Sequence, residues 1–108
     1  MLSRVPSRGL LLFTKPARAG RVKTRLIGEL RAEQAAELHA AFRDDLVDRL
    51  VEGPFELAIA WALDEGESLP SHRLPGLRQR GTDLGQRLHS ALAEAGRAHA
   101  VVAAVGSD

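Results

Sequence analysis

Apolar residues along this chain form three short runs, interrupted only by Glu56 in the second and His99 in the third, and two longer segments between them repeat apolar residues at helical spacing. The runs span residues 9–14, 55–63 and 98–105. A continuous apolar run of this length is typical of a strand buried on both faces, as in a parallel sheet. We expect all three runs to be buried strands, and residues 77–80 to add a short strand before the second helix.

The two periodic segments predict helices over residues 33–51 and 83–95. The sequence marks the second helix clearly, because Asp83 is a good N-cap and Gln86 follows three residues later, as in a capping box. Gly96 is placed to end that helix. The first helix has no Ser, Thr, Asp or Asn at its start, so the sequence does not fix where it begins. Strands alternating with helices predict an α/β fold, a Rossmann-like parallel-sheet domain in the order β-α-β-β-α-β.

Length and composition limit the classes of protein to consider. A chain of 108 residues is normally one domain, which we take to be residues 1–108. The chain has no cysteine, so disulfides and thiolate metal sites are excluded. No apolar stretch approaches the roughly 20 residues of a membrane span. We therefore expect a soluble cytoplasmic protein without membrane association.

The last predicted strand, residues 98–105, has no following element that would cover the sheet beside it. An exposed strand edge or apolar sheet face is either an interface or a liability for aggregation. We therefore expect a homo-oligomer that buries this uncovered sheet edge.

The segment after the first strand is strongly basic, although the net charge of the whole chain is only +1. Met1 to Gly28 holds seven Lys or Arg and no acid, and five of these cations follow the strand: Lys15, Arg18, Arg21, Lys23 and Arg25. Ligands of open α/β sheets bind beyond the carboxyl ends of the strands. A basic loop there suits a polyphosphate, and the alternative is a solvated basic N-terminus.

Known phosphate-binding and nucleic-acid-binding patterns fit poorly. Lys23-Thr24 matches the end of a P-loop, but Val22 and Ala17 stand where glycines are required. The chain also has no Tyr, three Phe and one Trp, which leaves few side chains for stacking on bases, so a nucleic-acid partner is not expected. The four histidines (His39, His72, His89 and His99) lack the spacing of metal ligands and are expected to be structural.

The basic loop resembles the signature loop of nucleotidyl and sugar-nucleotide transferases with a GT-A-like fold. The resemblance rests on Lys15-Pro16, Gly20 and Val22-Lys23-Thr24-Arg25-Leu26, and it is closest to the rSAM/selenodomain-associated transferase type 1 family, which is glycosyltransferase-like. Residues 33–42, 79–88 and 105–108 are similar to further segments of that family. Because the family's members are longer, the resemblance implies that this chain is the N-terminal, nucleotide-binding half of such a domain.

The resemblance implies a transferase that uses a nucleotide-activated donor, a nucleoside-diphosphate sugar, with this chain supplying the donor-nucleotide half of the site. Lys23 and Arg25 would bind phosphate and act in catalysis by stabilising the diphosphate leaving group. The further implied nucleotide ligands are Lys15, Gly20, Thr24, Gln79, Gly81 and Gly85, of which Gln79 and Gly81 would contact the base or ribose. Asp108 would hold Mg²⁺ or Mn²⁺ on the diphosphate.

Two other functions remain open. A nucleotidyltransferase that uses a nucleoside triphosphate would need the same loop. A non-catalytic nucleotide-binding or interaction fragment is favoured by the absence of the family's second half, so enzyme activity is not assigned from the sequence.

Overall fold

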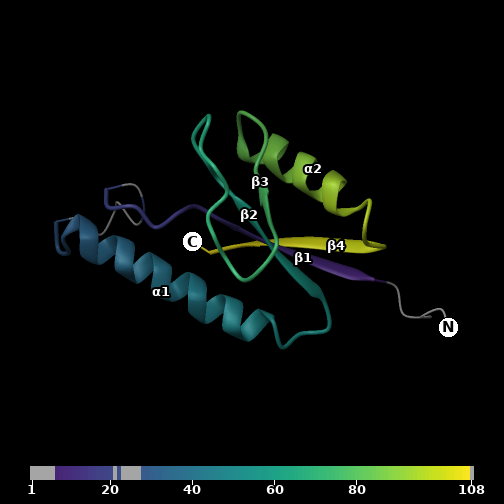
Figure 1. Cartoon of the computed structure of the whole chain (residues 1–108), viewed down its shortest axis with the longest axis horizontal. Coiled ribbons are helices and arrows are strands. Elements are labelled where there is room, and N and C mark those ends of the chain that lie inside the picture. The colour runs from purple at the N-terminus through teal and green to yellow at the C-terminus, as the bar shows by residue number, and fades with distance from the viewer. Residues whose placement is uncertain (1–6, 21, 23–27, 108) are drawn as a thin grey trace.

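A computed structural model of the chain describes residues 7–20, 22 and 28–107. These described residues form four strands and two helices, shown in Figure 1: β1 (Arg8–Thr14), α1 (Ala32–Leu50), β2 (Glu56–Trp61), β3 (Gly76–Arg78), α2 (Leu84–Ala95) and β4 (Val101–Gly106). The predicted order β-α-β-β-α-β is confirmed. Each element lies within a few residues of the range that the sequence predicts.

The four strands form one sheet in the order β3-β2-β1-β4. Every pairing is parallel, as predicted. Thr14 pairs with Trp61, Trp61 pairs with Arg78, and Phe13 pairs with Gly106, so the four strands end together. All four carboxyl ends therefore meet at one edge of the sheet, where the chain after each strand can contribute to a shared site.

The helices lie on opposite faces of the sheet, with α1 below it and α2 above it in Figure 1. Under α1, Leu10, Leu12, Val47 and Leu57 form the buried core. Because side chains alternate along a strand, Leu11 points to the other face, which α2 covers with its buried Ala91. Within the described residues, neither helix is long and apolar enough to cross a membrane.

Both helix starts use a glutamine, though not in the way predicted for α2. The Asp83 carboxylate accepts a hydrogen bond from the Gln86 backbone N–H at 2.8 Å, which confirms the cap. Gln86 does not complete a capping box with Asp83, because its Oε1 accepts from the N–H and hydroxyl of Thr82 instead. At α1, the side chain of Gln34 accepts from the Arg31 N–H at 2.9 Å and so marks a start that the sequence left open.

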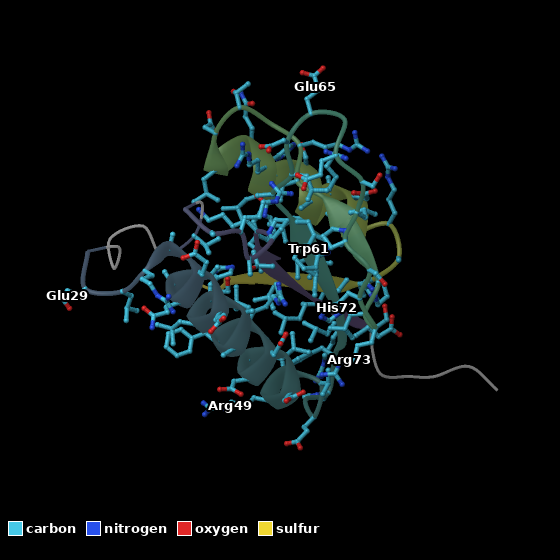
Figure 2. All side chains as sticks on the ribbon, turned by 60° about the vertical axis from the view of Figure 1, so that its left-hand side comes forward. Glu29, Arg49, Trp61, Glu65, His72 and Arg73 are labelled. Carbon is cyan, nitrogen blue, oxygen red and sulfur yellow. The ribbon has the colours of Figure 1, made fainter. Side chains whose placement is uncertain are left out.

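Trp61 packs in the core, with only 2% of its surface exposed. The Arg43 guanidinium lies 5.5 Å from the centre of its ring, and His72 meets the ring edge-on at 6.1 Å. Burial, followed by the positive charge of Arg43, lowers the pKa of His72. Figure 2 shows His72 beside Trp61, so this histidine has the structural role that the sequence predicts.

The prediction of a buried last strand is wrong for β4. Its side chains are exposed or half-buried, and Val101 and Val105 are 55% and 38% exposed. β4 lies at the edge of the sheet and pairs with β1 alone. Val105 pairs with Leu12, whose side chain faces α1, so its exposure shows that α1 does not reach over β4.

We propose that a second copy of the chain pairs with this open edge. Among the described residues, the outer backbone groups of β4 have no strand partner, and unpaired edges favour association. Sedimentation across a tenfold dilution series in the micromolar range should show a dimer or larger species. Val101→Lys should shift the distribution toward monomer, and Leu69→Lys, in the loop before β3, should not. A monomer at every concentration would contradict the proposal.

Candidate functional site

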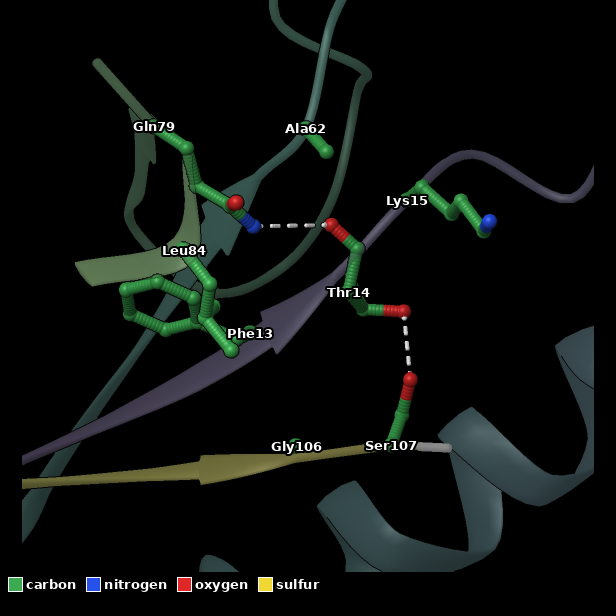
Figure 3. Close-up of a pocket in the computed structure, with 8 residues that line it drawn as sticks. All are labelled: Phe13, Thr14, Lys15, Ala62, Gln79, Leu84, Gly106 and Ser107. Carbon is green, nitrogen blue, oxygen red and sulfur yellow. Dashed lines mark hydrogen bonds between the residues drawn. The ribbon is translucent and has the colours of Figure 1, made fainter. Parts of the chain in front are cut away.

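A pocket of about 290 Å³ opens at the carboxyl edge of the sheet. The residue that directly follows each strand lines it: Lys15 after β1, Ala62 after β2, Gln79 after β3 and Ser107 after β4. Phe13, Thr14, Leu84 and Gly106 complete the lining, and Figure 3 shows all eight residues. The pocket therefore lies where ligands of open α/β sheets bind.

The Gln79 amide has a fixed orientation in this pocket. Its Nε2 donates to the carbonyl oxygens of Ala60, at 2.8 Å, and Thr14, at 3.3 Å. Because carbonyl oxygens only accept hydrogen bonds, the reversed amide would place oxygen against oxygen. The Oε1 of Gln79 has no partner among the described residues, so it remains available as an acceptor for a ligand group that donates.

A second hydrogen-bonded group joins the ends of β1 and β4. The Ser107 hydroxyl donates to Thr14 Oγ1 at 2.8 Å, and the Ser107 backbone N–H donates to the Phe13 carbonyl at 3.1 Å. His39 approaches these residues from α1: its Nε2 lies 3.0 Å from the Lys15 carbonyl oxygen and 3.4 Å from Thr14 Oγ1. Thr14 and His39 are both buried, so this group forms the floor of the site.

The cations at this edge differ in whether their charge is already paired. Arg18 forms ion pairs with Asp64, at 3.4 Å, and with Glu67. Arg78 donates hydrogen bonds to the backbone carbonyls of the same two residues, so both arginines are already bound to the loop that follows β2. Lys15 has no ion pair with any described residue, and it borders both the main pocket and an adjoining hollow of about 210 Å³. Of these three cations, Lys15 is the one available to a ligand.

The basic loop is described only in part. Gly20 has a φ of 78°, a left-handed conformation that favours glycine, and an added Cβ would meet nothing within 4 Å. The turn therefore explains this glycine without a ligand. Four predicted site residues lie outside the described residues: Lys23, Thr24, Arg25 and Asp108. Their roles stay predictions.

The predicted glycines near α2 do not line the main pocket. Gly81 and Gly85 border a different hollow of about 420 Å³, together with Gln86 and His89. Gly81 has a φ of 136°, and a Cβ there would lie 2.6 Å from the Cβ of Gln86, so packing within the chain already requires glycine. At Gly85 an added Cβ would meet only Asp83 Oδ1, at 3.3 Å. Their part in nucleotide binding stays a prediction.

Sequence reasoning missed Thr14, Ser107, Phe13 and Leu84 as residues of the site. Thr14 carries no motif of its own, and Ser107 lies in the family-like segment 105–108, in which only Asp108 was given a role. The available signal was positional, because residues at the carboxyl ends of parallel strands converge at one edge. That rule finds Ser107 by the same logic that finds Lys15.

The described residues alone do not form a metal centre. No group of three or more His, Cys, Asp or Glu side chains among them could hold a metal ion. A single carboxylate with phosphates and water can suffice for Mg²⁺, but the predicted carboxylate, Asp108, lies outside the described residues. The Mg²⁺ or Mn²⁺ site therefore stays a prediction, and no reaction step is derived through it.

Comparison with known proteins supports the fold. No family model and no curated protein matches the chain. A solved structure does, that of a "putative nucleotide-diphospho-sugar transferase" from Desulfovibrio desulfuricans G20, with a TM-score of 0.82 and 29% sequence identity. The match covers 96% of this chain and 48% of the other, so the chain spans about half the length of that protein. The α/β fold with its four-stranded parallel sheet thus matches half of a GT-A-like transferase chain.

Proposed function

We propose that this chain binds a nucleotide-activated donor, a nucleoside-diphosphate sugar, and supplies the donor-nucleotide half of a transferase site. The observation that carries the proposal is the pocket built from the residues that follow the four strands. It combines a cation without a described ion-pair partner, Lys15, with a fixed acceptor, Gln79 Oε1. The description of the similar solved structure as a "putative nucleotide-diphospho-sugar transferase" supports the same class of ligand.

The arrangement of the pocket suggests how such a ligand would lie. In Figure 3 the Lys15 side chain and the Gln79 amide extend to opposite sides of Thr14. The ammonium of Lys15 would attract the diphosphate, while Gln79 Oε1 would accept a hydrogen bond from the base or ribose. Phe13 and Leu84 offer an apolar wall. The pocket has a volume of about 290 Å³, and pockets that enclose a drug-sized molecule have volumes from about 300 Å³ upward. This pocket would therefore hold only part of the ligand.

Lys23 and Arg25 would add phosphate contacts beside Lys15, as the family resemblance implies. In that case the chemistry of this half of the site is electrostatic, since cations placed at the diphosphate stabilise the negative charge that develops as it leaves. Thr24 would add a hydroxyl or backbone donor. Arg25→Ala and Lys23→Ala test this assignment directly, because each should weaken nucleotide binding. If both variants bind the nucleotide with wild-type affinity, the phosphate lies elsewhere.

A thermal-shift panel tests the proposed function. The protein is scanned with nucleoside diphosphates, nucleoside triphosphates, nucleoside-diphosphate sugars and inorganic diphosphate, each with and without Mg²⁺ or Mn²⁺. A ligand at 100 times its dissociation constant should stabilise the fold by about 2.7 kcal/mol. We expect the largest shifts from nucleoside diphosphates and their sugars.

The other outcomes of the panel separate the alternatives. A clear preference for triphosphates would favour a nucleotidyltransferase. Equal shifts with inorganic diphosphate and nucleotides would show a phosphate site without base recognition. No shift with any nucleotide at millimolar concentration would contradict the proposed function.

A further inference from the structure

The Lys15 carbonyl lies just beyond the part of β1 that the sheet holds. The pairing of β1 with β2 ends at Thr14, whose carbonyl still accepts the Ala62 N–H at 2.9 Å. One residue later, the Lys15 carbonyl accepts a hydrogen bond from a side chain, that of His39, whose Nε2 lies 3.0 Å away. The backbone that presents the Lys15 ammonium to the pocket is thus held from α1.

The chemistry of this contact fixes the proton on the imidazole. A carbonyl oxygen only accepts, so Nε2 of His39 must carry a hydrogen and donate it. His39 is only 1% exposed, so water does not readily replace the Lys15 carbonyl as its hydrogen-bond partner, and losing this bond would cost free energy. The same nitrogen lies 3.4 Å from Thr14 Oγ1, which in turn accepts from the Ser107 hydroxyl. One imidazole N–H therefore faces both residues at the tip of β1 and, through Thr14, reaches the tip of β4.

We infer that His39 is a positioning residue for the nucleotide site. Its Nε2–H sets the place of the Lys15 backbone, and with it the reach of the Lys15 ammonium toward the diphosphate. It also holds the Thr14–Ser107 pair that forms the floor of the pocket. This inference rests on the proposed function, and it gives a histidine without metal-ligand spacing a role in binding beyond packing.

Two substitutions separate the donor from the bulk of the side chain. His39→Leu puts an apolar side chain of similar size in place of the imidazole and removes the N–H. His39→Gln places an amide N–H near the position of Nε2 and keeps the donor. The dissociation constant of the tightest-binding nucleoside diphosphate is measured by calorimetry at a temperature where both variants are folded.

We expect His39→Leu to weaken binding about fivefold to tenfold, the effect of losing one buried hydrogen bond. His39→Gln should bind within about twofold of wild type, because the donor is restored. In a Lys15→Ala background, His39→Leu should cause little further loss, since the two residues act through one contact. If His39→Leu and His39→Gln lose equal amounts of stability and neither changes the affinity for the nucleotide, the role of His39 is purely structural and the inference is overturned. It is also overturned if His39→Gln binds the nucleotide as weakly as His39→Leu.

A ligand-free measurement keeps the inference separate from the proposed function. In amide NMR spectra, His39→Leu should shift the signals of Lys15 and Ser107, while His39→Gln should leave them close to their wild-type positions. Unchanged Lys15 and Ser107 signals in His39→Leu would overturn the inference even if nucleotides bind. If no nucleotide binds the wild-type protein but His39→Leu shifts the Lys15 and Ser107 signals as expected, the proposed function and the contact of Lys15 with the diphosphate are overturned. The positioning of Lys15 and Ser107 by His39 would still hold.

Discussion

Replacing Leu12 with alanine should lower the free energy of unfolding by about 2–5 kcal/mol, the range found for truncating a fully buried leucine. Leu12 is 0% exposed, lies in the central strand β1, and packs in the core with Leu10, Val47 and Leu57. Strand and helix neighbours surround it, so the cavity cannot collapse easily. Urea denaturation should show a lower midpoint with an unchanged slope.

Leu69→Ala is the matched control for this change. Leu69 is 47% exposed in the loop between β2 and β3, so the same truncation should change stability by no more than about 0.5 kcal/mol. A comparable loss in the two variants would show that the core under α1 is not packed as described.

Replacing Lys15 with alanine should weaken the binding of a nucleoside diphosphate about tenfold or more, because a hydrogen bond to a charged group contributes about 1.5–3 kcal/mol. The ammonium has no ion pair with a described residue, so its removal should leave the fold intact. Calorimetric titration measures the change. The affinity of wild type should also fall as salt rises, since an ionic contact is screened.

Arg97→Ala controls for the change in net charge. Arg97 follows α2 and precedes β4, at the amino edge of the sheet and so at the end opposite the pocket. Its loss should leave nucleotide affinity within about twofold, because a screened charge more than about 10 Å away contributes little. A loss of affinity equal to that of Lys15→Ala would show that overall charge, and not the pocket, governs binding.

The sequence was sufficient to predict the fold because the strands of a parallel sheet are apolar along their whole length. The run around Leu11 and the run around Ile59 are buried as their patterns indicate. The run from Val101 was misleading, because an edge strand and a central strand can have the same composition. Which strand lies at the edge depends on pairing order, and no local pattern records that order.

The site was predictable in position and only partly in composition. Lys15 was predicted because it directly follows a strand and belongs to a segment that resembles the family, and Gln79 was predicted from the family resemblance of residues 79–88 alone. Thr14 was missed because a hydroxyl at a strand end has no distinctive spacing. Ser107 was missed although it lies in the family-like segment 105–108, because only Asp108 of that segment was given a role. Gly81 shows the opposite limit: the family resemblance implies a contact with the base or ribose, but the packing of Gln86 already requires a glycine there.

The position of β1 between β2 and β4 also constrains how the chain can fold while it is being synthesised. Thr14 and Ser107, which hydrogen-bond at the tips of β1 and β4, are 93 positions apart in the sequence. Contacts so distant form late, because the loop between them must close first. On the ribosome, β1 emerges early and can pair on one side with β2, but its other side must wait for the whole of β4. Until then the nascent chain carries an open edge at β1, whose residues Leu10 to Phe13 are all apolar, and a chaperone that shields this edge should raise the yield of folded protein.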